Sequence, residues 1–275
     1  MPQGFRPGAD PLTKRSSRVV AVRKLARRKV RDERRQFLAE GPQAVAEALR
    51  RSGTVVELFA SAPAAERYDE LIDLAVADGV SVHEVTDDGL AALTETVTPQ
   101  GLVAVCRYLD VDVPSSPRLV AVLDGISDPG NAGTILRAAD ATGADATVFP
   151  DATVDPYNGK CVRSSVGSLF HLPVVRGGDT ATIVERLRAD GLRVLAADAH
   201  GDTDLDDLID AGSLVSPTAW LFGSEAHGLP EHVAALADAR VKVPIYGHAE
   251  SLNLATAATV CLYASARQHR RGAPQ

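Results

Sequence analysis

Residues 241–255 have the sequence VKVPIYGHAESLNLA, and the rest of the chain is best understood from this stretch. The apolar residues up to Ile245 predict a buried strand, Gly247 predicts a loop, and a helix follows. Ser251 or Asn253 can cap that helix, because a short side-chain oxygen accepts hydrogen bonds from its free N–H groups. Open α/β sheets bind ligands where a strand gives way to a helix. The stretch therefore predicts either a ligand site or simply a well-capped terminal helix.

Strands and helices alternate throughout the part of the chain that precedes this stretch. We expect strands at 119–123, 146–149, 172–175, 193–197, 218–222 and 241–245, and helices near 133–142, 180–190 and 230–237. Such alternation is typical of a mostly parallel sheet covered by helices on both faces. We therefore predict an α/β domain over residues 118–270, after a linker at 109–117 in which prolines and serines lie among acids.

The N-terminal part predicts a smaller α/β domain over residues 17–108. A basic helix is expected over 17–35, followed by strands at 36–41, 54–60, 80–85 and 102–108 and helices at 42–51, 64–77 and 87–93. Residues 1–16 contain glycine, proline and scattered charge and are expected to be disordered. The domain holds no catalytic constellation, which favours a binding or positioning role.

Residues 124–137, DGISDPGNAGTILR, form a second polar junction after an expected strand. Pro129 and Gly130 predict a turn, and Asn131 can cap a helix starting near Gly133. Arg137 follows more than one helical turn later. An amide and a guanidinium at the positive end of a helix suit a phosphate-bearing substrate. The alternative is an ordinary capped helix with a surface arginine.

Residues 221–229, LFGSEAHGL, form a third junction. Two glycines flank Glu225 and His227, which would let a ligand approach the backbone closely; the alternative is a turn with an ordinary surface acid. The chain has no Gly-x-Gly-x-x-Gly after a strand and no Gly-x-x-x-x-Gly-Lys-Ser/Thr. A dinucleotide site or a P-loop is therefore not expected.

Composition indicates a soluble, cytoplasmic protein. The chain of 275 residues is 45% hydrophobic and 24% charged, with no apolar run long enough to cross a bilayer and no signal-like N-terminus. Cys106, Cys161 and Cys261 are widely spaced and lack metal-ligand spacing, so we expect reduced thiols, no metal and no membrane.

The net charge of −7 conceals a basic N-terminus, because residues 1–35 hold twelve Lys or Arg against three acids. Guanidinium groups bind phosphate oxygens in a bidentate manner. A solvated charged tail is the alternative, but an arginine-rich segment favours nucleic acid. The arginines expected to contact RNA are Arg23, Arg27, Arg28, Arg31 and Arg35.

Taken together, the three junctions resemble the three ordered motifs of the SpoU/TrmH family of RNA ribose 2′-O-methyltransferases, within the SPOUT superfamily. The motifs are Asn131 with Arg137, then residues 222–228, then residues 244–253. Residues 160–170, KCVRSSVGSLF, resemble the family's segment between the first two motifs. Residues 17–105 are similar to the L30e-like substrate-binding domain of rRNA-modifying members.

The resemblance implies a SPOUT-type sheet with a deep trefoil knot, and S-adenosylmethionine as the methyl donor. Carried over by motif position, the residues implied to bind this cofactor are Ala197, Gly223, Val243, Ile245 and Leu252, with the adenine against Ile245 and Leu252. The residues implied to be catalytic are Asn131, Arg137, Glu225, Ser251 and Asn253.

In the implied mechanism Arg137 lies beside the ribose hydroxyl and its 3′-phosphate, with Asn131 fixing it. The family's arginine has been proposed as the base, but an arginine keeps its proton at neutral pH. We therefore prefer stabilisation of the developing alkoxide. Ser251 and Asn253 would hold the loop and the ribose, and Glu225 would anchor a neighbouring polar group or be a bystander.

The two-domain layout favours large-subunit rRNA as substrate, as either a housekeeping or an antibiotic-resistance modification. The resemblance also implies a homodimer formed through the knot helices. Two alternatives remain at this level: a tRNA ribose 2′-O-methyltransferase, and a catalytically silent RNA-binding assembly factor. The retained motif residues disfavour the second.

Overall fold

The computed structural model describes residues 10–272 and divides the chain into two units. Of the described residues, the first unit contains 10–109 together with Tyr157–Phe170, and the second contains Asp110–Pro156 and 171–272. The segment Tyr157–Phe170 thus packs with the N-terminal part of the chain, although its neighbours in sequence on both sides belong to the second unit.

The second unit is built on a seven-stranded sheet of order β7-β6-β5-β10-β8-β11-β9. The strands are β5 (Leu119–Leu123), β6 (Ala146–Phe149), β7 (Val174–Arg176), β8 (Arg193–Ala197), β9 (Thr203–Asp204), β10 (Thr218–Phe222) and β11 (Ala239–Lys242). All neighbouring pairs are parallel. The predicted mostly parallel sheet is confirmed.

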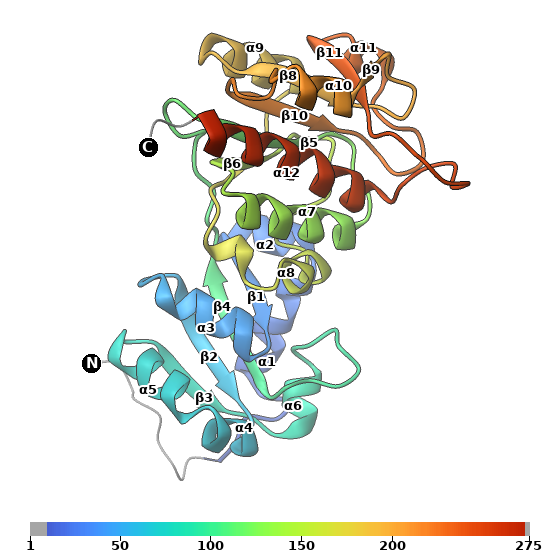
Figure 1. The fold of residues 1–275 in the computed structure, drawn as a ribbon. Helices are drawn as coiled ribbons and strands as arrows, with labels where there is room; N and C mark the ends of the chain where they lie inside the picture. Colours follow the sequence, from blue (N-terminus) through green and yellow to red (C-terminus); the bar gives the residue numbers. More distant parts are fainter. Residues whose placement is uncertain (1–9, 273–275) are drawn as a thin grey trace. The chain divides into compact units, whose positions relative to one another are not determined.

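Helices cover both faces of this sheet. On one face α7 (Pro129–Thr142) and α12 (Leu254–Gly272) run side by side and contact β5, and α10 (Leu205–Asp210) contacts α12 (Figure 1). On the other face α9 (Thr180–Ala189) and α11 (Glu231–Ala234) supply apolar side chains to a core with β5, β6, β8 and β10. Side chains of a strand alternate between the two faces of the sheet. In β10, Leu221 therefore packs in the core with α9 and α11, and Trp220 points toward α12.

The end of one strand and the start of one helix in this unit differ from the sequence prediction. Strand β11 ends at Lys242 instead of Ile245, because Pro244 has no N–H group for the sheet. Helix α7 begins at Pro129 and is capped by Asp128, whose side chain accepts a hydrogen bond from Gly130 N, so the expected cap at Asn131 is wrong. Proline suits the first turn of a helix, since the N–H it lacks would have no partner there. Strand β9 and helix α10 were not predicted. The deep trefoil knot stays a prediction.

The first unit contains a four-stranded sheet of order β1-β4-β2-β3. The strands are β1 (Gln36–Glu40), β2 (Val55–Ala60), β3 (Ser81–Glu84) and β4 (Leu102–Arg107), and the helices are α1 (Ser17–Val22), η1 (Arg23–Ala26), α2 (Arg28–Arg34), α3 (Pro42–Arg50), α4 (Ala62–Arg67), α5 (Asp69–Ala77), α6 (Asp87–Ala91), α8 (Gly159–Ser165) and η2 (Ser168–Phe170). Strand β4 is antiparallel to both β1 and β2. The predicted smaller α/β unit is confirmed.

Two predicted helices of this unit are broken. The expected helix over 17–35 is interrupted at Arg27, whose backbone is extended, and the expected helix over 64–77 is interrupted at Tyr68. Disorder predicted for residues 1–9 lies outside the described residues. For residues 10–16 the prediction is wrong, because Leu12 N donates to Glu84 O at 2.8 Å and Leu12 O accepts from Thr86 N at 3.0 Å.

Candidate active site

Four strands of the second unit end in one row at the same edge of the sheet. The register pairs Phe222 with Leu123 on one side and with Ala197 on the other, and Ala197 pairs with Val241. Because the strands are parallel, the segments that follow β5, β10, β8 and β11 all leave from this edge. The three polar junctions found in the sequence therefore lie at the position where open α/β sheets bind ligands.

Glu225 joins the first two junctions. Its carboxylate accepts hydrogen bonds from Ser127 N at 3.3 Å, Ser127 Oγ at 3.2 Å and Asp128 N at 3.2 Å. It also accepts one from Asn131 Nδ2 at 3.0 Å. The loop after β10 is thus fixed to the start of α7 through one side chain.

Asn131 and Asn253 join the first junction to the third. Asn253 Nδ2 donates to Asn131 Oδ1 at 3.1 Å, so both ends of the Asn131 amide are engaged. Asn253 Oδ1 accepts from Ala255 N at 2.9 Å and Thr256 N at 3.3 Å, which caps α12 as predicted. A continuous chain of side-chain hydrogen bonds therefore runs from Glu225 to the start of α12.

The pKa of Glu225 lies below its ordinary value. Partial burial raises it, but hydrogen bonds from Asn131 and from the backbone of Ser127 and Asp128 together outweigh that effect. An ionised acceptor with several donors is an anchor, whereas a general base works best with a pKa near the working pH. The geometry therefore favours the anchoring role for Glu225.

The loop after β10 requires a glycine at Gly223. A Cβ built there would lie 2.3 Å from the carbonyl carbon of Gly228 and 2.3 Å from Leu229 N. Ser224 and Gly228 form an antiparallel bridge with N–H···O distances of 3.0 and 2.9 Å. The returning loop thus accounts for the glycine at Gly223, and the approach of a ligand to the flanking glycines stays a prediction.

Arg137 and Ser251 differ from the other predicted catalytic residues. Arg137 is exposed on α7 and Ser251 is exposed in the loop before α12. Neither side chain makes a hydrogen bond or ion pair with another residue of the part of the chain that the structure describes. The expectation that Asn131 fixes Arg137 is therefore wrong, since its amide bonds Glu225 and Asn253.

The predicted cofactor residues lie on or just after the ends of the strands. Ala197 ends β8, Gly223 follows β10, and Val243 follows β11. Ile245 and Leu252 are each 37% exposed, which is high for large aliphatic side chains beside a polar network. Exposed apolar surface next to strand-end backbone groups suits a flat heteroaromatic ring with polar edges.

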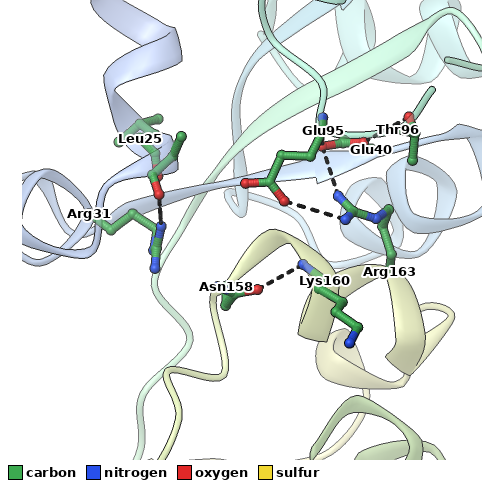
Figure 2. Close-up of polar contacts among 9 residues, drawn as sticks. Leu25, Arg31, Glu40, Glu95, Thr96, Asn158, Lys160 and Arg163 are labelled. Carbon is green, nitrogen blue, oxygen red and sulfur yellow. Dashed lines mark hydrogen bonds and ion pairs between the residues drawn. The ribbon is translucent and has the colours of Figure 1, made fainter. Parts of the chain in front are cut away.

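The arginines of the basic segment that were predicted to contact RNA differ in whether they are free to bind a phosphate. Arg31 is 4% exposed, and its Nη1 donates to Leu25 O at 2.9 Å and Ala26 O at 2.8 Å, as Figure 2 shows for Leu25. It binds the carbonyls that end η1 and is not available to phosphate. Arg35 lies over the ring of Tyr108 at 4.9 Å and Arg28 pairs with Asp32 at 3.7 Å, yet both are exposed. Arg23 and Arg27 are exposed too.

Sequence reasoning missed Ser127 and Asp128, which donate to Glu225 through backbone and hydroxyl groups. These contacts join residues almost one hundred positions apart, and no local pattern encodes them. The Asp-Pro pair was the one available signal, since aspartate before proline is typical of a helix start. Within residues 10–272 no group of three His, Cys, Asp or Glu side chains could hold a metal ion, and no helix could span a membrane.

Comparison with known proteins identifies the family. The SpoU rRNA Methylase family matches residues 118–263, and the MRM3-like substrate binding domain matches residues 16–104. A Bacillus subtilis protein, 23S rRNA (guanosine(2553)-2′-O)-methyltransferase RlmP, is 34% identical over 94% of this chain and 97% of its own length. A 23S rRNA (uridine(2479)-2′-O)-methyltransferase of Streptomyces viridochromogenes is 40% identical over 63% of this chain and 62% of its own.

Solved structures give the same result. The SpoU methyltransferase AviRb from Streptomyces viridochromogenes, in complex with AdoMet, superposes with a TM-score of 0.81 at 31% identity, covering 94% of this chain and 100% of its own. An AdoMet-bound rRNA methyltransferase from Sinorhizobium meliloti gives 0.80 at 31% identity, covering 94% and 97%. The chain belongs to the SpoU rRNA methylase family.

Proposed function

We propose that this protein transfers the methyl group of S-adenosylmethionine to a ribose 2′-hydroxyl of large-subunit rRNA. The observation that carries the proposal is the hydrogen-bond chain from Glu225 through Asn131 to Asn253, which joins all three motif loops at one edge of the sheet. The two relatives above are named as 23S rRNA 2′-O-methyltransferases, which supports the same substrate class here.

The cofactor would be held at the ends of β8, β10 and β11. Ile245 and Leu252 offer apolar surface for the adenine, and the backbone around Ala197, Gly223 and Val243 offers polar groups to its edges. When bound, S-adenosylmethionine supplies a methyl group on a positively charged sulfur, which a weak oxygen nucleophile can accept.

Arg137 would bind the substrate. Its guanidinium is exposed and has no partner among the described residues, whereas the polar side chains around Glu225 are engaged with one another. A ribose 2′-hydroxyl is a weak nucleophile that becomes negative as it loses its proton. A cation that keeps its own proton can stabilise that charge and hold the adjacent phosphate, but it is a poor base.

Ser251 and Asn253 would have different roles, one in binding the ribose and the other in holding the loop. Asn253 caps α12 and binds Asn131, so its amide holds the loop in place. Ser251 has no partner among the described residues, and its hydroxyl is free to bind the target ribose. Glu225 holds the loop after β10 against the start of α7 and does not contact the reacting atoms in this proposal.

We further propose that two copies associate through α12. This helix buries Ala258, Cys261 and Leu262 within its own unit but exposes Val260 at 38% and Tyr263 at 52%. Tyr263 also lines a cavity of about 410 Å³ between α12 and the end of α7, together with two alanines and three arginines of these helices. Light scattering should give twice the chain mass, and Tyr263→Lys should give a monomer; a wild-type protein that stays monomeric would contradict the association.

The proposed substrate is tested by mapping 2′-O-methylation on rRNA from cells with and without the gene. One ribose of the large-subunit rRNA should lose its methyl group when the gene is deleted and regain it when the gene is restored. An unchanged rRNA map together with a lost methyl group in tRNA would assign the enzyme to tRNA instead.

A further inference from the structure

A polar cavity of about 300 Å³ lies in the first unit, outside the methyl-transfer site. It opens between the start of α3, the loop joining α6 to β4, and helix α8. Its lining includes Gln43, Thr94, Thr96, Thr98, Gln100 and Arg163. The volume is at the lower end of small-ligand sites, which suits one flat ring system with its attached sugar.

Glu40 fixes the walls of this cavity. Its side chain is 7% exposed, and Oε1 accepts from Glu95 N at 3.0 Å and from Arg163 Nη1 at 3.1 Å. Its Oε2 accepts from Thr96 Oγ1 at 3.2 Å. Figure 2 shows these residues converging from β1, the α6–β4 loop and α8. One buried carboxylate thus ties three segments together, and the cavity is formed without a ligand.

The charges of the lining disfavour a phosphate. Arg163 is the cation of the lining, and it is paired with both Glu40 and Glu95, with Nη2 to Glu95 Oε2 at 3.3 Å. Two carboxylates therefore offset one guanidinium, which leaves the cavity without net positive charge. A neutral ligand that is rich in hydrogen-bonding edges suits this balance better than an anion.

The neutral side chains of the lining offer such hydrogen bonds. Within residues 10–272, Thr98 and Gln100 make no hydrogen bond with another residue, and Gln43 makes only a long one, from Nε2 to Val166 O at 3.4 Å. A carboxamide presents a donor and an acceptor side by side, which is the pattern that a base edge complements.

A fully exposed apolar side chain stands in the same loop. Val97 is 101% exposed and lies between Thr96 and Thr98, both of which line the cavity. Among the described residues, the next most exposed large hydrophobic side chain is 84% exposed. Apolar surface presented at the mouth of a polar cavity suits the face of a nucleobase, because single-stranded RNA offers unstacked bases with polar edges and apolar faces.

From these observations we propose that the cavity receives one extruded nucleobase of the RNA substrate. Gln43 and Gln100 would bind its edge, Thr98 its attached ribose, and Val97 would pack against the neighbouring base. This inference rests on the proposed function, because it concerns the RNA that the enzyme methylates. It names a third point of RNA recognition, separate from Arg137 and from the basic segment.

Missing-base interference tests the proposal with the full chain. Large-subunit rRNA from cells that lack the gene is treated so that each molecule loses about one base at random, and bound and unbound molecules are compared by primer extension. Removal of the extruded base should weaken binding by the wild-type protein about tenfold, which is the usual effect on affinity of losing a good bidentate contact to a base edge.

The double variant Gln43→Ala/Gln100→Ala should lose the interference at that one base and keep it at every other base. A matched pair, Glu66→Ala/Asp73→Ala, removes exposed side chains from α4 and α5 of the same unit and should keep the whole pattern. Thr98→Trp fills the cavity from an exposed position and should act like the double variant, so it decides the outcome if the double variant folds poorly.

An interference pattern that is identical for wild type, the double variant and Thr98→Trp would overturn the proposal. Methyl incorporation into untreated RNA is measured in parallel. Methyl transfer with an unchanged pattern refutes the cavity alone, whereas no methyl transfer to any RNA refutes the proposed function and leaves the binding test valid.

Discussion

Arg137 lies exposed on α7 with no partner among the described residues, and α7 begins at the edge where the three motif loops meet. If it stabilises the developing alkoxide, Arg137→Ala should lower the rate of methyl transfer by about a hundredfold to a thousandfold. Binding of S-adenosylmethionine should change little, since the predicted cofactor residues belong to β8, β10 and β11. Titration calorimetry and single-turnover methylation measure the two effects; loss of cofactor binding in the variant would contradict the assignment.

Glu225 should stabilise the folded protein, and this contribution should depend on pH. Its pKa is lowered in the folded protein, so its hydrogen bonds contribute stability above the ordinary pKa of a glutamate and lose that contribution as the pH falls through the lowered value. Glu225→Gln would turn an N–H₂ group toward donors of Ser127, Asp128 and Asn131. Because the carboxylate is partly exposed, the substitution should lower the free energy of unfolding by only about 1 kcal/mol at neutral pH.

Urea unfolding of wild type and Glu225→Gln across pH 3 to 7 checks this expectation. The difference in unfolding free energy should be largest at neutral pH and shrink at the acid end. A difference that does not vary with pH would mean that the carboxylate charge is irrelevant to the network.

At the scale of elements, α12 is attached to the sheet by one buried hydrogen bond. Trp220 Nε1 donates to Ser265 Oγ at 2.9 Å, and both residues have no exposed surface. Ser265→Ala leaves the indole N–H without a partner and should lower the free energy of unfolding by about 2 kcal/mol. Thr256→Ala, at an exposed position of the same helix, should change it by less than about 0.5 kcal/mol. Chemical denaturation that finds equal effects would contradict this role for Ser265.

Most elements of the second unit were predictable because their residues carry local signals. The ends of β5, β6, β8 and β10 follow from short apolar runs bounded by polar residues. The two-residue strand β9 and the acidic helix α10 carry no such run. The break of the basic segment at Arg27 depends on Arg31 turning back to bind Leu25 O and Ala26 O, which is a tertiary contact.

At the scale of the whole molecule, charge is concentrated where RNA contact is proposed. The chain carries −7 overall, yet residues 1–35 carry twelve basic side chains against three acids. Deleting this segment would remove Val19, Val22 and Leu25 from the core of the first unit, so substitution is the cleaner test. Arg23→Ala/Arg27→Ala should weaken RNA binding and reduce the slope of log affinity against log salt by roughly 1.4, about 0.7 for each lost phosphate contact.

Arg51→Ala is the matched control for this charge effect, since Arg51 is exposed in the same unit but lies outside the segment. Its salt slope should stay closer to that of the wild type than the slope of the double variant. An unchanged slope in the double variant would exclude phosphate contacts by Arg23 and Arg27.

The candidate site shows where prediction from sequence ends. Asn131, Glu225 and Asn253 were identified as site residues, but their mutual contacts join residues 94 and 122 positions apart and depend on the order of strands in the sheet. Sequence spacing therefore paired Asn131 with its near neighbour Arg137. The sheet order pairs it with the loops after β10 and β11 instead.

The central claim is that this protein methylates ribose 2′-oxygens in rRNA. The direct measurement incubates the purified chain with radiolabelled S-adenosylmethionine and large-subunit rRNA from cells lacking the gene, then digests the RNA and identifies the labelled nucleoside. We expect label in a single 2′-O-methyl nucleoside, present with wild type and about a hundredfold or more weaker with Arg137→Ala. Label on a base, or none with the wild-type protein, would contradict it.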